Sequence, residues 1–287
     1  MGDPYRIVTW PTLVDPPLVV MLTGWIDAGG AAQAAMEALE SELATDVVAV
    51  FDEDTFIDYR ARRPTMQLRE GVNTKLEWPQ ITLKAGRDRS GHDVLLLTGH
   101  EPDSAWQGFC RAVTGLAGDL GVSMMVGLGA YPFAAPHSRP TRLSVTASSA
   151  EVADRHSFLR SSIDVPAGVA AALEIALSQA GIPALGLWAQ VPHYAANMPC
   201  PAAATALLGA LTDVSGIVSN PVALRNDATI QRQRLDELVL ANEEHIDMVR
   251  QLEAAYDEVP TTSTAGPMPS GEELVAELER YLRDQGE

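Results

Sequence analysis

The chain has 287 residues, of which 46% are hydrophobic and 20% are charged, so it is long enough to bury a full core. Its formal net charge of -18 makes a nucleic-acid partner unfavourable, because the phosphate backbone would be repelled. The two cysteines, Cys110 and Cys200, provide no disulfide framework and indicate a reducing compartment.

The N-terminal sequence shows no secretory signal. It reads MGDPYRIVTWP, without a basic segment followed by an apolar one. The first apolar run is far too short to span a bilayer. We therefore expect a soluble cytoplasmic protein that does not associate with a membrane.

Short apolar runs alternate with helical patterns along most of the chain. Several of these runs are unbroken, which is typical of strands covered on both faces. This alternation predicts a three-layer α/β/α sandwich around a mostly parallel sheet. The expected strands span residues 18–23, 47–51, 81–85, 94–98, 124–129, 143–147 and 185–189. The expected helices span residues 30–44, 104–120, 166–181 and 201–215, and an antiparallel hairpin is expected between residues 62 and 99.

The composition changes after residue 222, so we expect a domain over residues 1–222 and a helical extension over residues 223–287. Apolar side chains at three- and four-residue spacing between Leu235 and Tyr256 predict one long amphipathic helix. A Pro/Ser/Thr linker follows, and Ser270 with Glu273 forms a capping box for a final helix.

Four predicted strands are each followed by a loop rich in polar and aromatic residues. If these strands are parallel, all four loops emerge at the carboxyl edge of the sheet, where open α/β sheets bind ligands. The sequence therefore predicts a polar cleft at this edge. Its candidate residues are Trp25, Asp27, His100, Glu101, Trp106, His137, Arg139, His193 and Tyr194.

Each of these residues also has a structural interpretation. An aspartate between a strand and a helix, such as Asp27, is more often an N-cap. Trp25 at such a turn more often covers the core, and histidines in proline-rich loops often bond only to backbone. In a catalytic interpretation, a carboxylate acts as base or nucleophile and a histidine acts as general acid.

A second candidate site is the basic cluster in DYRARRP, residues 58–64. Arg60, Arg62 and Arg63 stand together in a very acidic chain. Guanidinium groups bind carboxylates and other anions, so the cluster is either an anion clamp or a set of pairs with the protein's own acids, within or between subunits.

Several common catalytic motifs are absent from the sequence. It contains no phosphate-binding P-loop, no G-x-S-x-G nucleophile elbow and no H-E-x-x-H or paired C-x-x-C motif. We therefore expect neither a bound cofactor nor a metal site.

Six segments in the same order resemble the actinobacterial branch of the proteasome assembly chaperone 2 family. The resemblance runs from about Leu18 to the end of the chain. It implies a phosphorylase/hydrolase-like α/β/α fold and work in protein–protein interaction or assembly. The segments are LTGWIDAGGAA, DYRARRP, LLLTGHEPDSAW, PHSRPTRLSVTASS, VPHYAANMPCPAAATALL and LANEEHI.

This sequence lacks the C-terminal motif found in some members of the family. Archaeal members that dock on the proteasome end in a hydrophobic residue, tyrosine and any residue, whereas this sequence ends in YLRDQGE with Tyr281 too far back. That mode of proteasome docking is therefore not expected. The long helix also needs a partner surface, which favours a homo-oligomer, with a trimer as the first expectation.

Two other functions stay open at this point. One is a small-molecule enzyme, of hydrolase or phosphorylase type, that uses the cleft. The other is an ATP-dependent carboxylate–amine ligase, which is disfavoured because Lys75 and Lys84 are the only lysines and neither lies in a glycine-rich loop. An enzyme needs a concave pocket with convergent polar groups, whereas a binding protein does not.

Overall fold

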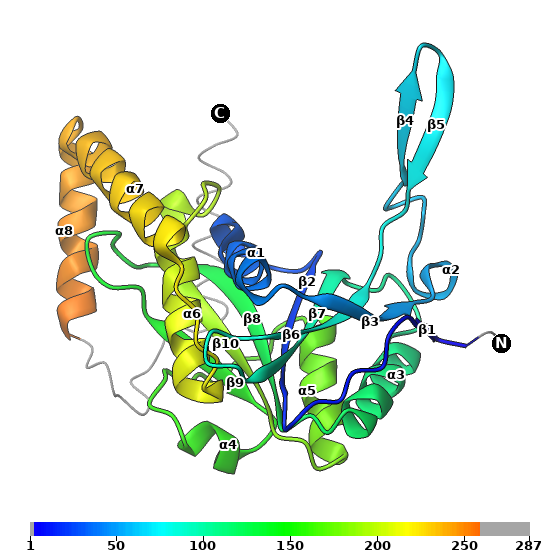
Figure 1. Ribbon diagram of the computed structural model, residues 1–287. Coiled ribbons are helices and arrows are strands. Elements are labelled where there is room, and N and C mark those ends of the chain that lie inside the picture. Colours follow the sequence, from blue (N-terminus) through cyan, green and yellow to red (C-terminus); the bar gives the residue numbers. More distant parts are fainter. Residues whose placement is uncertain (1–2, 259–287) are drawn as a thin grey trace.

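A computed structural model describes residues 3–258, and a single eight-stranded sheet forms its centre (Figure 1). The strand order is β1-β3-β6-β7-β2-β8-β10-β9. The strands are β1 (Tyr5–Ile7), β2 (Pro17–Thr23), β3 (Asp46–Phe51), β6 (Thr82–Arg87), β7 (Asp93–His100), β8 (Met124–Phe133), β9 (Leu143–Ala147) and β10 (Ala184–Pro192). This sheet with helices on both sides confirms the predicted α/β fold.

The four central strands are parallel. β2 pairs with β7 and with β8, and β8 pairs with β10, all in the parallel sense. Their apolar runs are buried on both faces, as shown by Val19 and Val20, neighbours on opposite faces that are both fully buried. The prediction that the strands near 18–23, 94–98, 124–129 and 185–189 share one direction is confirmed.

The outer strands are antiparallel, so the sheet as a whole is mixed and not mostly parallel as predicted. β6 pairs antiparallel with β7 and with β3, β1 with β3, and β9 with β10. Only residues 88–92 connect β6 to β7, and a connection this short allows a hairpin but no crossover. Parallel pairing is thus confined to the block that positions the four predicted loops.

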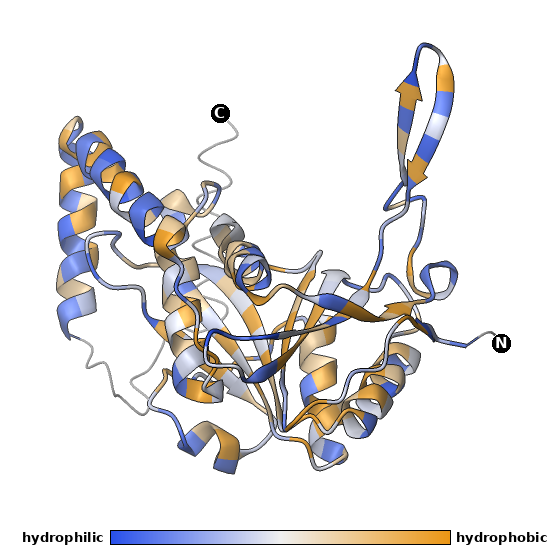
Figure 2. Cartoon of the chain, viewed as in Figure 1, coloured by the Kyte–Doolittle hydropathy of each residue, from blue (hydrophilic) through white to orange (hydrophobic). Residues whose placement is uncertain are grey.

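Helices cover both faces of the sheet and produce two hydrophobic clusters. One cluster includes residues of α1 and α6, and the other includes residues of α3 and α5. This gives the three predicted layers, and Figure 2 shows the apolar residues on the inner sides. The helices are η1 (Ala28–Gly30), α1 (Ala31–Leu43), α2 (Glu53–Phe56), α3 (Trp106–Asp119), α4 (Ala150–Asp154), α5 (Val169–Gln179), η2 (His193–Ala195) and α6 (Pro201–Ser215).

The predicted long C-terminal helix is wrong, because the chain forms two helices there. α7 (Val222–Leu240) and α8 (Glu243–Glu258) fold into a helical hairpin (Figure 1). Asn242 lies between the two helices, and its Oδ1 accepts the backbone N–H of Glu244 at 2.9 Å and caps α8. Leu235 and Val249 of the stripe are buried within the chain. The predicted linker and final helix lie outside the described residues.

A two-stranded hairpin projects away from the main sheet. Its strands β4 (Thr65–Arg69) and β5 (Val72–Glu77) pair only with each other, as predicted for this antiparallel segment. Figures 1 and 2 show it standing clear of the body, with hydrophobic residues along it. Among residues 3–258, no helix combines the length and apolar character needed to cross a bilayer.

Candidate functional site

The predicted cleft residues fall into two separate groups. Trp25, Asp27, His100 and Glu101 lie at the ends of β2 and β7, and Glu101 lines a small cavity there. His137 and Arg139 line a different groove, next to α6 and α7. The lining residues of the cavity and the groove do not overlap, so the carboxyl edge is not one convergent polar cleft in this structure.

Asp27 caps α1. Its Oδ1 accepts the backbone N–H of Ala32 at 2.8 Å, and its Oδ2 accepts that of Gln33 at 3.0 Å. Burial raises the pKa of the Asp27 carboxyl, and these backbone hydrogen bonds partly offset that rise. The role observed is therefore the structural one, because both oxygens satisfy the first amides of the helix.

Glu101 caps α5 from a different part of the chain. Its side chain is buried, and Oε1 accepts the backbone N–H of Val169 at 2.5 Å. Burial raises the pKa of the Glu101 carboxyl, although this hydrogen bond and the charge of Arg62 act in the opposite direction. Glu101 thus ties the end of β7 to the beginning of α5.

His100 and Arg62 lie beside Glu101. The Nδ1 of His100 is 2.7 Å from the hydroxyl of Thr23, and burial with the nearby Arg62 charge lowers the pKa of the imidazole. Arg62 forms an ion pair with Asp103 at 3.2 Å, while its buried Nε has no hydrogen-bond partner within residues 3–258. Of the predicted arginine cluster, Arg62 therefore pairs within the chain, whereas Arg60 and Arg63 are exposed.

Trp25 covers a cavity of only about 30 Å³ on the α5 side of the sheet. The ring packs against Gly168, where a β-carbon would come within 2.8 Å of it. The cavity is also lined by Glu174, a buried carboxyl that the sequence analysis missed. Its one visible signal was a lone acid inside the apolar segment VAAALEIAL.

Glu174 takes part in a small buried network. Its Oε1 accepts the hydroxyl of Thr146 at 3.0 Å, and the same hydroxyl oxygen accepts Nε1 of Trp188 at 3.2 Å. Burial raises the pKa of Glu174 to about 7, an effect that the Thr146 hydrogen bond only partly offsets. Gly186 leaves the space for this network, because a β-carbon there would lie 2.7 Å from Oε1.

Trp106 belongs to neither group. It begins α3, and its Nε1 donates to the carbonyl of Pro102 at 2.6 Å. It lines a separate surface groove together with Pro4, Tyr5 and Phe56. It therefore fixes its own loop to the first turn of the helix.

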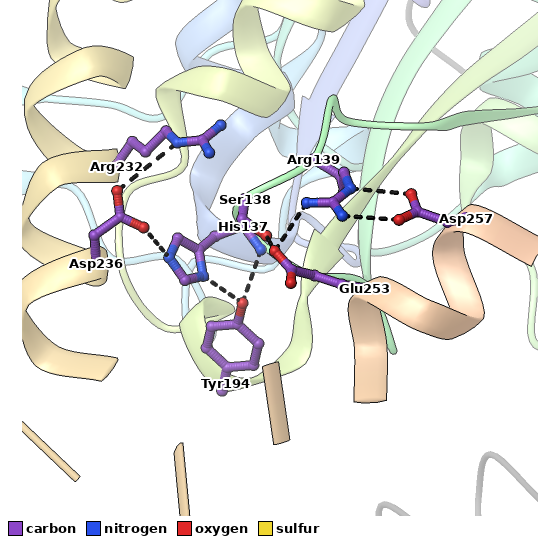
Figure 3. A network of polar contacts seen from close by, with 8 residues as sticks. All are labelled: His137, Ser138, Arg139, Tyr194, Arg232, Asp236, Glu253 and Asp257. Atoms are coloured by element: carbon purple, nitrogen blue, oxygen red, sulfur yellow. Dashed lines mark hydrogen bonds and ion pairs between the residues drawn. The ribbon is translucent and has the colours of Figure 1, made fainter. Parts of the chain in front are cut away.

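The second group connects the loop after β8 with the C-terminal helices (Figure 3). The hydroxyl of Tyr194 accepts the backbone N–H of His137 at 2.8 Å and lies 2.7 Å from its Nδ1. Burial raises the pKa of Tyr194 to about 12, so the phenol keeps its proton at neutral pH. Nε2 donates to Asp236 on α7 at 3.1 Å. Both ring nitrogens of His137 are thus engaged.

Arg139 fixes α8 to the same loop. Its Nε and Nη2 bind the two carboxylate oxygens of Asp257 at 3.0 and 2.8 Å, and Nη1 binds Glu253 at 2.8 Å (Figure 3). Ser138 donates to Glu253 as well. The guanidinium of Arg142 stacks 3.6 Å above the ring of Tyr256. We call these contacts between residues 137–142 and α7–α8 the latch.

An open groove of about 580 Å³ runs between α6, α7 and the loop that contains residues 137–142. His193 does not line it and is exposed, in edge-to-face contact with Tyr194. The groove contains the thiol of Cys200, whose pKa is raised by burial, so it is not a thiolate nucleophile at neutral pH. Among the described residues, no three His, Cys, Asp or Glu side chains are grouped to hold a metal ion.

The comparisons with known proteins place the chain in a family. The PAC2 family profile matches residues 21–239, and the chain belongs to the PAC2 family. This confirms the resemblance found in the sequence. No curated protein matches the chain.

Several solved structures of similar proteins come from actinobacteria. A Mycobacterium tuberculosis protein of unknown function, Rv2714, is 35% identical with a TM-score of 0.80, over 90% of this chain and 92% of that one. A PAC2 family protein from Streptomyces avermitilis is 34% identical with a TM-score of 0.75, over 82% of this chain and 100% of that one. The M. tuberculosis proteasome-assembly chaperone homologue Rv2125 is 31% identical with a TM-score of 0.75, over 81% of this chain and 99% of that one.

Proposed function

We propose that this protein is a cytoplasmic assembly factor that binds proteasome subunits through its surface. The observation that carries the proposal is the similarity to the M. tuberculosis proteasome-assembly chaperone homologue, which extends over 99% of that chain. Membership of the PAC2 family agrees with it. The negative net charge also favours protein partners over nucleic acid.

The arrangement of the predicted site residues supports binding more than catalysis. The cavity beside Glu101 and Glu174 has about 30 Å³, whereas small-molecule sites usually have a few hundred or more. The groove of about 580 Å³ is large enough, but its His137 and Arg139 are already bound to Asp236 and Glu253. Asp27 and Glu101 accept helix amides, and His137 has no free ring nitrogen. We therefore propose that these side chains hold the fold and the latch together. No observation favours the hydrolase or the ligase alternative.

Self-association is part of the proposal, with a homotrimer as the expected state. Leu238 and Leu240 of the helical hairpin are 59% and 73% exposed, and Met66 and Leu68 of the β4–β5 hairpin are about half exposed. Exposed apolar side chains grouped on projecting elements are typical of protein interfaces. Both elements extend from the body, where another subunit can reach them (Figure 1).

Proteasome α subunits from the same organism provide the test. We expect the full-length chain to accelerate ring formation by purified α subunits, followed by native mass spectrometry, and to appear in intermediates that the final particle lacks. An unrelated acidic protein of similar mass controls for charge. Unchanged assembly kinetics, with no complex containing the chain, would refute the proposal.

A further inference from the structure

The open groove between α6 and α7 has helical walls of small and apolar side chains. They are Ala202, Thr205 and Ala206 on α6, and Ala228, Thr229 and Leu235 on α7. The hydroxyls of both threonines donate to carbonyls one turn earlier in their own helices, at 2.8 and 3.0 Å. Small side chains allow another helix to approach closely, so the groove fits an apolar helical segment.

The rim of this groove is basic. Arg139, Arg225 and Arg232 line it, whereas none of its described lining residues is an aspartate or a glutamate. Arg139 is already bound by α8. Among residues 3–258, the side chain of Arg225 donates only to the neutral side chain of Asn220, and Arg232 reaches only Asp236, at 3.9 Å. The occupant of the groove should therefore be apolar and acidic.

Residues 259–287, which we call the tail, have this character in their sequence and lie outside the described residues. The capping box of Ser270 and Glu273 predicts a helix there. The apolar stripe of the predicted helix consists of Leu274, Leu278, Tyr281 and Leu282. The acidic residues of the tail are Glu272, Glu273, Glu277, Glu279, Asp284 and Glu287, against Arg280 and Arg283 as its basic residues.

The charges of the tail match those of the groove in spacing. On the predicted helix, Glu277 and Asp284 border the apolar stripe and are seven positions apart, which is about 10 Å along a helix axis. Arg225 and Arg232 on α7 are also seven positions apart. Two helices that lie side by side can therefore pair both carboxylates with both arginines.

The chain leaves the described part of the structure beside this groove. α8 ends at Glu258, and its last turn is fastened to the groove, because Asp257 pairs with Arg139 and the hydroxyl of Tyr256 donates to the carbonyl of Pro140 at 2.9 Å. Arg139 and Pro140 both line the groove. The linker over residues 259–270 spans about 40 Å when fully extended, whereas α6 is about 22 Å long. The tail can therefore reach the whole groove from its own chain.

We propose that the tail docks as a helix in the groove between α6 and α7 of the same molecule. Its apolar stripe covers the small side chains of the groove, and its carboxylates meet Arg225 and Arg232. A short linker gives an effective concentration of about 1 mM, so even an intrinsic Kd of about 0.1 mM keeps the groove about 90% occupied. At micromolar protein concentration this favours the chain's own tail over the tail of a second copy. The inference concerns the isolated chain, so it goes beyond the proposed function and does not depend on it.

Disulfide trapping in the full-length chain tests where the tail lies. Cys200 lines the groove, so Cys200→Ala serves as the background, and the other native cysteine is buried. Ala228→Cys in the groove is combined in turn with Leu274→Cys, Leu278→Cys or Leu282→Cys. On mild oxidation we expect at least one pair to form a disulfide within a single chain, detected by non-reducing electrophoresis and mass spectrometry.

Leu238→Cys is the matched control for the groove position. Leu238 also lies on α7, but it is 59% exposed and does not line the groove. With the same tail cysteines it should cross-link much more slowly than Ala228→Cys. Covalent dimers in place of closed single chains would put the tail on a second copy. That result, equal cross-linking at both positions, or no cross-linking at Ala228→Cys would overturn the inference.

Alkylation of a groove thiol measures how much of the time the groove is covered. In the Cys200→Ala background, the Ala228→Cys thiol should react with iodoacetamide about tenfold faster once Leu278→Asp is added, because occupation of about 90% leaves a tenth of the molecules open. Ala276→Asp is the control, since it adds the same charge on the opposite face of the predicted helix. Equal alkylation rates in all of these variants would contradict docking.

Charge exchange tests whether the two arginines of α7 bind the tail. Arg225→Glu with Arg232→Glu should expose the Ala228→Cys thiol to alkylation, and adding Glu277→Arg with Asp284→Arg should restore its protection. Equal helix content by circular dichroism shows that the fold is retained in each variant. If protection does not return in the combined variant, the carboxylates of the tail do not meet these arginines, and the proposed docking is wrong.

Discussion

The two groups of polar residues at the carboxyl edge differ in how deeply their charges lie. Glu101 lies at the end of β7 and is 7% exposed, and Glu174 lies on α5 and is 5% exposed. In the latch, the side chains of Arg139, Glu253 and Asp257 are 32%, 26% and 55% exposed. The first group lies within the sandwich, whereas the second joins the sandwich to a helical hairpin at its surface.

This difference determines what each group contributes. A buried carboxyl is costly to ionise and stabilises the fold mainly through the amides and hydroxyls that it accepts. Solvent-exposed ion pairs contribute little to global stability but select one arrangement of the segments that they connect. Substitutions at Glu101 or Glu174 should therefore alter the free energy of unfolding, and those in the latch should alter local opening of α8.

The largest expected effect is at Glu174. Its pKa is raised from 4.5 to about 7, so the folded chain binds a proton that the unfolded chain releases, and stability falls as pH rises through this window. Glu174→Gln should remove this loss and stabilise the protein by about 3 kcal/mol at pH 8, with little effect near pH 4. Urea unfolding of the wild type and Glu174→Gln at both pH values measures this difference in the free energy of unfolding. The exposed Glu151→Gln is the control, and equal pH dependence in wild type and Glu174→Gln would contradict the account.

The next effect is at Glu101. Glu101→Ala leaves the buried N–H of Val169 without its acceptor, and we expect a loss of about 2 kcal/mol in the free energy of unfolding. Glu101→Gln retains an acceptor oxygen and should lose clearly less. Urea midpoints compare the two variants. If they were equally destabilised, the capping hydrogen bond would not be the cause.

A smaller effect is expected at Asp27. Asp27→Ala removes the acceptor for the amides of Ala32 and Gln33, and loss of such a cap costs about 1 kcal/mol. Asp27→Asn can still accept one of these amides and should be milder. Thermal unfolding measures the difference. An Ala variant as stable as the wild type would remove the capping role.

The smallest change in global stability is expected at Arg139. Arg139→Ala should leave the unfolding midpoint nearly unchanged, while amide hydrogen exchange accelerates near Glu253 and Asp257. Added salt should produce part of the same acceleration in the wild type, since screening weakens exposed pairs. Arg250→Ala is the control, because Arg250 lies on the same helix and, among residues 3–258, pairs only with Asp247. Unaltered exchange in α8 would show that Arg139 does not hold the latch.

Much of the fold follows from local sequence patterns. The unbroken apolar runs identify β2, β7, β8 and β10 as strands covered on both faces, and the alternation of strands with helices along the chain favours their common direction. The break between α7 and α8 was missed because Leu235 to Tyr256 keeps helical spacing across Asn242. The spacing of apolar residues does not reveal a capping side chain, because the cap acts through a single hydrogen bond.

The site was harder to predict than the fold. Strand direction brings His137 and Glu101 to the same edge, but it does not determine how far apart they lie along that edge. The partners that engage the latch, Asp236, Glu253 and Asp257, lie about 100 residues later, in the segment predicted as a separate helical extension. Such long-range pairs depend on tertiary packing and leave no mark in local spacing.

The most direct test of the central claim is the affinity of the chain for proteasome α subunits of the same organism, measured by calorimetry. The account holds that the chain works through its surface and that the buried carboxyls only maintain the fold. It predicts saturable binding by the wild type, and equal affinity for a variant carrying Asp27→Asn and Glu174→Gln. Absence of binding by the folded wild type, or its loss in that variant while the fold is retained, would contradict the account.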